Sequence, residues 1–177
     1  ENHVTVVAQG HDPAEFDAVI ISAHSDQALN MLADPSNPER EILSAIPYQP
    51  NDVTLHTDRG MLPTRRGAWA AWNYHITREK RDRAALTYDM NILQTLDAPD
   101  EFCVTLNRNG DLDPNKVRRE LVYDHPVYTR ASVDAQSRWE EINGINRTYY
   151  CGAYWSYGFH EDGVKSALRV CEKFGKT

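Results

Sequence analysis

The stretch GAYWSYGFHEDGVKSALRV, residues 152–170, decides the expected fold. Gly158 and Gly163 flank a polar segment, and residues of little side-chain bulk follow, as in a helix whose start lies close to another group. The preceding residues 146–151 have the aromatic and β-branched content of a buried strand. We therefore predict the order strand, glycine turn, loop and helix.

The start of such a helix presents unpaired N–H groups and the positive end of the helix dipole. That end suits a phosphate, a carbonyl group or an anionic heterocycle. The alternative is an ordinary turn between a strand and a helix, capped by Asp162. Glycines at this spacing are common in both cases. Evidence from the rest of the sequence is therefore needed to distinguish a ligand-binding helix start from an ordinary turn.

Composition restricts the class of protein. The chain has 177 residues, of which 41% are hydrophobic, so it can bury one good core or two thin ones. The formal net charge of -7 argues against nucleic acid or an anionic membrane as the main partner. No apolar run is long enough to span a bilayer, and no signal peptide is visible.

Cysteine and histidine usage indicates the compartment and excludes a metal site. Cys103, Cys151 and Cys171 are widely separated and odd in number, so we expect neither a disulfide framework nor a zinc site with paired cysteines. A reducing, cytoplasmic compartment fits best. The histidines lack metal-ligand spacing, so we expect no metal. The alternating charges of residues 78–83 are interpreted as a solvated face.

Hydrophobic periodicity and turn residues predict a mixed α and β chain. The expected strands are residues 4–7, 16–23, 53–56, 68–74, 84–90, 102–106, 123–128 and 146–151, and the expected helices are 26–32, 39–46, 91–96 and a segment beginning near Asp162. The strands between residues 52 and 106 are expected to form a mostly antiparallel sheet. Residues 131–143 are expected to be an irregular or helical connector. The predicted fold class is α+β.

Seven segments carry a family resemblance through their joint order. They are FDAVIISAH (16–24), LHTDRGMLP (55–63), AWNY (71–74), TYDMNIL (87–93), VTLN (104–107), DHPVY (124–128) and CGAYWSYGFHEDGVKSA (151–167). Together they resemble the C-terminal part of bacterial flavin-containing amine oxidase-like proteins, distant relatives of monoamine oxidases and phytoene desaturase-type flavoenzymes. The resemblance covers nearly the whole chain.

The resemblance implies FAD as the cofactor, shared between a dinucleotide-binding domain and a substrate domain. It assigns residues 1–50 to the last strand and helices of the FAD-binding domain, residues 51–145 to the antiparallel sheet of the substrate domain, and residues 146–177 to the closing strand and helix of the FAD-binding domain. The chain has no G-x-G-x-x-G turn, so the pyrophosphate-binding part is expected in a missing N-terminal region. Glu1 in place of Met fits a fragment or a processed chain.

The closing motif matches the family's cofactor contacts position by position. The resemblance implies that Gly152 lets the backbone approach the ribityl and phosphate region. It implies that Gly163 and Val164 donate N–H groups to the pyrimidine carbonyl, where the helix dipole stabilises the reduced flavin. Relatives place an acidic residue where this chain has Tyr154, which departs from the pattern. The expected cofactor-binding residues are Gly152, Ala153, Tyr154, Asp162, Gly163 and Val164.

Tyr149 is the expected substrate-binding residue, because the family places one wall of an aromatic cage there. Its alternative role is core packing. Trp72, Tyr74 and Trp155 are candidates for the second wall, and no catalytic residue is assigned.

The function implied by the resemblance is that of an FAD-dependent oxidoreductase. Its FAD accepts hydride from a small molecule such as an amine, and the chain is expected to be inactive without the missing N-terminal region. The alternative is a stand-alone α+β binding or interaction module without a cofactor.

Overall fold

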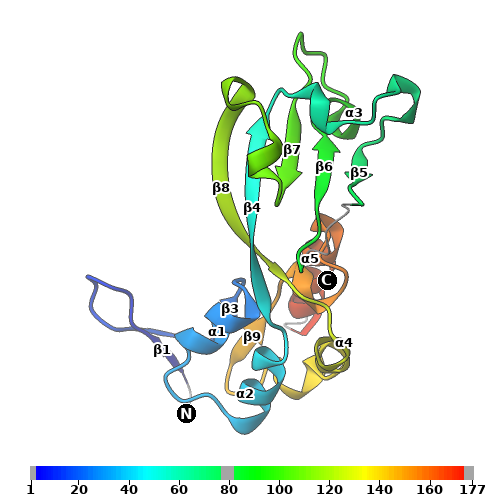
Figure 1. Cartoon of the computed structure of the whole chain (residues 1–177). Coiled ribbons are helices and arrows are strands. Elements are labelled where there is room, and N and C mark those ends of the chain that lie inside the picture. Colours follow the sequence, from blue (N-terminus) through cyan, green and yellow to red (C-terminus); the bar gives the residue numbers. More distant parts are fainter. Residues whose placement is uncertain (1–2, 77–81, 174–177) are drawn as a thin grey trace. The chain divides into compact units, whose positions relative to one another are not determined.

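The computed structural model describes residues 3–76 and 82–173 (Figure 1). The chain divides into two compact units, residues 1–48 with 126–177 and residues 49–125. Residues 126–145 therefore lie in the first unit, whereas the sequence assigns them to the substrate-domain sheet. Of the charged segment 78–83, residues 78–81 lie outside the described residues.

The first unit contains a pair of parallel strands. β3 (Val19–Ile21) pairs with β9 (Thr148–Tyr150). The single strand expected over residues 16–23 is divided, because β2 (Ala14–Phe16) forms an antiparallel hairpin with β1 (Val4–Val6) instead. Ile20 is 48% exposed, so β3 is not buried on both faces.

Four helices complete this unit: α1 (Ser25–Met31), α2 (Asn37–Ser44), α4 (Arg130–Ser137) and α5 (His160–Lys173). α2 begins two residues before the expected position because Ser36 and Glu39 form a capping box and Pro38 suits the first turn. Thr129 caps α4, and a 3-10 turn at Trp139–Glu141 follows, so the connector predicted at 131–143 is largely helical.

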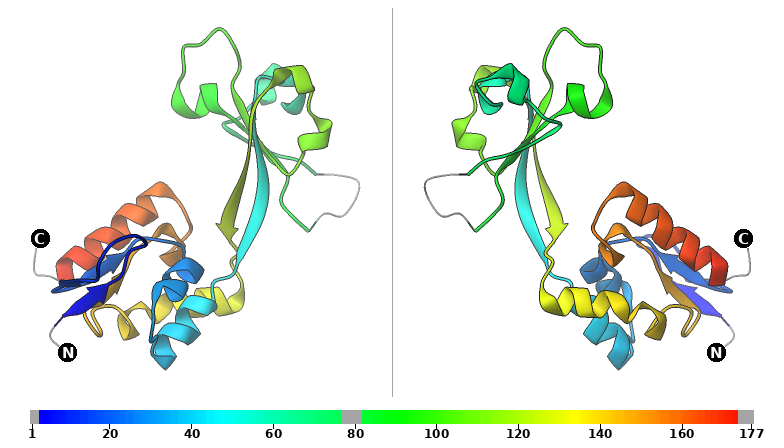
Figure 2. Two further views of the ribbon diagram at one scale, coloured as in Figure 1. Left: turned by 90° about the vertical axis from the view of Figure 1, so that its left-hand side faces the viewer. Right: turned by 90° about the vertical axis from the view of Figure 1, so that its right-hand side faces the viewer.

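Side chains alternate across β9 and divide the core of this unit. Tyr150 packs with Ile21 and residues of α1, α2 and α4, whereas Cys151 packs with Trp139 and Val170 of α5. Figure 2 shows α5 along one face of the β3 and β9 pair. The strand pair therefore has helices on both faces, as in parallel sheets generally.

The second unit is a five-stranded sheet in the order β5-β6-β7-β4-β8. Its strands are β4 (Tyr48–His56), β5 (Trp72–Tyr74), β6 (Leu86–Asp89), β7 (Cys103–Leu106) and β8 (Val117–Pro126). The β4-β7, β5-β6 and β6-β7 pairs are antiparallel, which confirms the predicted sheet and the α+β class. α3 (Met90–Gln94) follows β6, and 3-10 turns occupy Arg59–Met61, Arg66–Ala68, Asn109–Asp111, Pro114–Lys116 and, in the first unit, Ala153–Trp155.

One face of this sheet is polar and buried. Thr105 of β7 lies between Thr54 of β4 and Thr87 of β6 in the strand register, and all three are fully buried. Connecting segments cover this face, since Thr54 donates to Asn109 and His56 accepts from the amide of Asp58. The opposite face carries the apolar residues Val53, Leu86 and Leu106. Among the described residues, no helix is long and apolar enough to cross a membrane.

Candidate functional site

The turn between β9 and α5 requires glycine at its first position. Gly152 has φ of +157°, and a Cβ atom there would lie 2.7 Å from Cδ1 of Tyr154. The Tyr154 ring therefore occupies the space above the Gly152 backbone. Gly158 has φ of +87° and faces the Tyr128 hydroxyl. Gly152 thus serves close packing within the turn, and Gly158 serves the contact of the turn with Tyr128.

Tyr154, where the resemblance predicts an acidic residue, lies in the core of the first unit. It is 4% exposed, its ring centroid is 5.0 Å from that of Trp155, and burial raises the pKa of its hydroxyl. Among the described residues, neither that hydroxyl nor the Trp155 indole nitrogen has a hydrogen-bond partner. In this structure the side chain fills the core and does not face solvent.

The start of α5 lies earlier than expected. The amides of Asp162 and Gly163 both donate to the carbonyl of Phe159, at 3.0 and 3.2 Å. The Asp162 carboxylate caps the helix by accepting from the Phe159 amide at 3.0 Å. The N–H groups to which helix geometry offers no acceptor are those of His160 and Glu161. The unpaired donors therefore precede the expected Gly163 and Val164.

Carboxylates weaken the positive field at this helix end. Glu161 and Asp162 lie in the first turn, and Glu161 forms an exposed ion pair with Lys165 at 3.9 Å. Negative side chains there partly offset the helix dipole. The end suits an uncharged acceptor, such as a carbonyl oxygen, better than a phosphate. The donors therefore fit the pyrimidine edge of a flavin.

The aromatic residues around the start of α5 differ from the expected one. Tyr149 packs with Trp139 and Val170 in the core beneath α5. Tyr157 and Phe159, which directly precede the helix, are 80% and 70% exposed. Exposed aromatic surface at this end of the first unit thus comes from the turn. Of the other candidates, Trp155 lies in the first unit, and Trp72 and Tyr74 lie in the second.

Two residues that the sequence does not single out hold this turn. Ser166 lies within the quoted motif and binds the Gly152 amide. Gln136 of α4 binds two carbonyl groups of the turn. The sequence signal for the contact between Ser166 and the Gly152 amide is weak, since it is only a serine three residues after a helical glycine. The second contact depends on how α4 packs, and the sequence carries no signal for it.

A row of hydrogen-bonded side chains crosses the polar face of the second unit. His56 Nε2 lies 2.7 Å from Thr105 Oγ1, which lies 2.7 Å from Thr87 Oγ1. Thr87 Oγ1 lies 2.8 Å from His75 Nε2, and Arg108 donates to His75 Nδ1 at 2.8 Å. Such a row resembles a proton relay, so the protonation of its two histidines decides its role.

Both histidines are held neutral. The Asp58 amide donates to His56 Nδ1 at 3.0 Å, and a guanidinium donates to His75 Nδ1, so each ring carries its hydrogen on Nε2. Burial lowers the pKa of His56 to about 4, and burial followed by the charge of Arg108 lowers the pKa of His75. Neither ring takes up a proton near neutral pH, so the row is structural.

Two carboxyl groups are buried together where β6 ends and β7 begins. Asp89 is fully buried and Glu101 is 7% exposed. Burial and the neighbouring Asp89 raise the pKa of Glu101. Asp89 Oδ1 accepts from the Ile92 amide, and its Oδ2 has no donor unless Glu101 is protonated. These effects favour the protonated form of Glu101, which can donate to Asp89.

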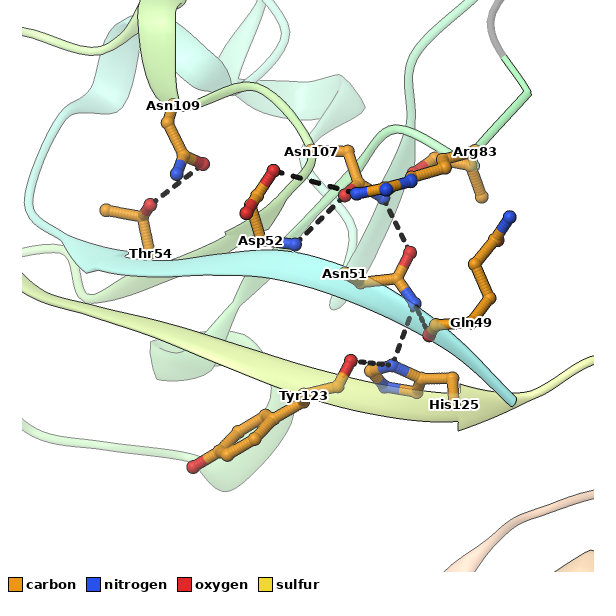
Figure 3. Close-up of polar contacts among 10 residues, drawn as sticks. Gln49, Asn51, Asp52, Thr54, Arg83, Asn107, Asn109, Tyr123 and His125 are labelled. Carbon is orange, nitrogen blue, oxygen red and sulfur yellow. Dashed lines mark hydrogen bonds and ion pairs between the residues drawn. The ribbon is translucent and has the colours of Figure 1, made fainter. Parts of the chain in front are cut away.

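The remaining polar cluster joins β4, β8 and the turn after β7 (Figure 3). Asn51 Nδ2 lies 3.1 Å from His125 Nδ1, and its Oδ1 accepts from Asn107 at 2.8 Å. Asn107 has φ of +58°, and its side chain also accepts from the Asp52 amide. These bonds fix strand ends and the turn. Among residues 3–76 and 82–173, no group of three or more His, Cys, Asp or Glu could hold a metal.

Comparison with known proteins finds solved structures with a similar fold. No family model and no curated protein matches the chain. A protein described as a candidate protoporphyrinogen oxidase from an Exiguobacterium species matches with a TM-score of 0.62 and 14% identity over 98% of this chain and 44% of that chain. The CLA-producing fatty acid isomerase from P. acnes matches with a TM-score of 0.59 and 15% identity over 98% of this chain and 45% of that chain. The chain thus shares its α+β fold with under half the length of these two proteins.

Proposed function

We propose that this chain is the C-terminal part of an FAD-dependent oxidoreductase of the amine oxidase-like type, whose substrate is an amine or a related small molecule. In this proposal, a dinucleotide-binding region N-terminal to these residues completes the flavin site. The observation that carries the proposal is the open edge of β3.

The outer edge of β9 is closed by side chains and by its own turn. The Tyr150 amide donates to Asn143 Oδ1 at 2.7 Å, and the Trp139 indole donates to the Tyr150 carbonyl at 3.1 Å. The Gly144 amide donates to the Thr148 carbonyl at 2.9 Å. A further strand has no free backbone groups to pair with on this side.

The outer edge of β3 is open. The Val19 amide and the Ile21 carbonyl bond toward β9, so alternation directs the N–H and C=O groups of Ile20 to the opposite side. In the described part of the chain β3 pairs only with β9. Parallel sheets of two strands are rarely stable alone, so this edge supports the docking of another strand.

A cleft is lined by residues of β1, of β3 and of the segment that leads into β9. Its volume is about 1060 Å³, and it is lined by Val4 and Val6 of β1, Val19 and Ile21 of β3, and Met31 of α1, among others. The lining also contains polar residues, such as Asp34 and Arg147. Its apolar part favours burial by a further segment of protein. The cleft and the open edge both involve β3, so each supports docking of a further segment at this strand.

The start of α5 supports the position of the flavin ring. In the proposal, the amides of His160 and Glu161 donate to its pyrimidine carbonyl, while Tyr157 and Phe159 limit water around the ring. When bound, the flavin supplies the hydride-accepting group. Tyr149 as a cage wall is not supported by its packing beneath α5.

The test uses a proline on the open edge. Ile20→Pro removes the outward N–H group but no hydrogen bond between β3 and β9, because those bonds come from Val19 and Ile21. In the protein extended by its upstream region, we expect bound flavin in the wild type and Ile20→Ala, and loss of flavin in Ile20→Pro. In the 177-residue chain, both variants should unfold at similar urea concentrations.

Two results would overturn the proposal. Extended wild-type protein that carries no flavin would favour the stand-alone module. Retention of flavin by Ile20→Pro would show that no strand docks at this edge.

A further inference from the structure

The turn that leads into α5 is tied to that helix by a buried serine. Ser166 is 7% exposed, and its Oγ accepts from the Gly152 amide at 2.8 Å and donates to the Gly163 carbonyl at 2.8 Å. One hydroxyl thus joins the end of β9 to the first turns of α5. The same contact brings Ala153 against Gly163, where a Cβ atom would lie 3.9 Å from the Ala153 nitrogen.

The other side of the turn is tied to α4 by one amide nitrogen. Gln136 Nε2 donates to the Tyr154 carbonyl at 2.8 Å and to the Ser156 carbonyl at 2.7 Å. Both hydrogens of this nitrogen are used, so the glutamine fixes the turn at two points. Within the turn, the amides of Ser156 and Gly158 both donate to the Ala153 carbonyl at 3.1 Å.

We infer that Gln136 and Ser166 are positioning residues that preorganise the unpaired amides of His160 and Glu161. This inference rests on the proposed function, in which those amides bind the pyrimidine carbonyl of the flavin. Hydrogen-bond donors stabilise developing charge best when they need not move. The turn is fixed by α4 and by the body of α5, so the start of α5 is held from both sides.

A control variant separates the positioning role of Ser166 from the general effect of losing a serine in a helix. Ser137 provides a matched control, because its Oγ donates to the Asp134 carbonyl three residues earlier, as Ser166 donates to that of Gly163. It makes no second bond to a turn and is exposed. Ser137→Ala therefore removes a similar helical contact without releasing the turn.

The experiment uses the protein extended by its upstream region. We expect Ser166→Ala and Gln136→Glu each to weaken FAD binding by about tenfold, the equivalent of one hydrogen bond. The reduction potential should become more negative, because the reduced flavin loses stabilisation. Ser166→Thr, which keeps the hydroxyl, should restore both values, and Ser137→Ala should change neither. Amide exchange at Gly152 reports directly on the released bond.

The two failures are distinguishable. Wild-type protein without flavin overturns the proposed function and this role together. Flavin that binds with unchanged affinity and potential in both Ser166→Ala and Gln136→Glu, while Gly152 exchanges faster in Ser166→Ala, overturns the positioning role alone.

Discussion

The hydroxyl of Tyr150 donates a 2.6 Å hydrogen bond to Oε1 of Glu39, and both residues are buried. Glu39 Oε2 accepts at 2.7 Å from the amide and the hydroxyl of Ser36. The bond joins β9 to α2 across the core of the first unit. Burial followed by Glu39 raises the pKa of Tyr150, so the phenol remains a donor.

Tyr150→Phe should lower the free energy of unfolding by about 1–3 kcal/mol, because a buried carboxylate oxygen loses its donor. Urea denaturation of the 177-residue chain measures the loss. Tyr157→Phe is the matched control, since it removes a hydroxyl from a ring that is 80% exposed. Equal stability of the two variants would show that the Glu39 contact contributes nothing.

His56 should make the fold sensitive to acid. Its pKa is about 4 in the folded chain, against 6.5 for an unperturbed histidine. Between pH 6.5 and 4, His56 is therefore protonated in the unfolded chain but neutral in the folded chain. The stability that is present above pH 6.5 is lost as the pH falls toward 4. The loss is about 3 kcal/mol.

Urea unfolding at a series of pH values tests this prediction. His56→Gln should lose this part of the pH dependence, whereas His160→Gln, at the start of α5, should keep it. A His56→Gln variant with the slope of the wild type would place the acid sensitivity elsewhere.

Glu101→Gln should stabilise the second unit near neutral pH. The folded-state pKa of Glu101 is raised, so its contribution is complete at low pH and is lost as the pH rises through that value. Glutamine donates to Asp89 Oδ2 without titrating, so the gain should be on the order of 1 kcal/mol at neutral pH and should vanish in acid. Thermal unfolding at both pH values measures it, with the exposed Glu120→Gln as control. A gain that persists unchanged in acid contradicts a shared proton.

Asn107→Asp should destabilise the turn after β7 (Figure 3). Asn107 Nδ2 donates to Asn51 Oδ1 and to the Ala84 carbonyl, both at 2.8 Å. Aspartate keeps the size and tolerates the left-handed backbone, but it places an oxygen against two oxygens. We expect a loss of about 1–3 kcal/mol by urea denaturation. Asn109→Asp should cost little, because its Oδ1 already accepts from Thr54; similar losses in both would refute the donor argument.

The antiparallel sheet was predictable because local signals and packing agree there. The strands around Thr87 and Thr105 are rich in β-branched and apolar residues and are bounded by turns. β8 was underestimated because residues 118–120 are Arg, Arg and Glu, and an edge strand needs no apolar run. The length of β8 follows from its pairing with β4, and this pairing cannot be predicted from the sequence of β8 alone.

The closing strand, turn and helix were predictable in order, but the donors at the start of α5 were not. These donors depend on which carbonyl is the first to accept a helical hydrogen bond. That carbonyl belongs to Phe159, three residues before the expected start at Asp162. The contact of Gln136 arises from the packing of α4 against the turn. Tertiary contacts of this kind leave no periodicity in the sequence.

Gly163 should tolerate alanine but not valine. A Cβ atom at this position would lie 3.9 Å from both the nitrogen and the Cβ of Ala153, which is ordinary van der Waals contact. Alanine therefore fits and gains up to about 1 kcal/mol of helix propensity. The additional methyl groups of valine would meet Ala153 and separate the turn from α5, at a cost of about 1–3 kcal/mol.

Urea denaturation of Gly163→Ala and Gly163→Val in the 177-residue chain measures these changes, and FAD content in the extended protein measures their effect on the site. Full FAD content in Gly163→Val would mean that the flavin does not depend on the packing of the turn against α5. Loss of FAD in Gly163→Ala, with its stability intact, would instead mean that the cofactor approaches the Gly163 backbone directly, as the family resemblance implies.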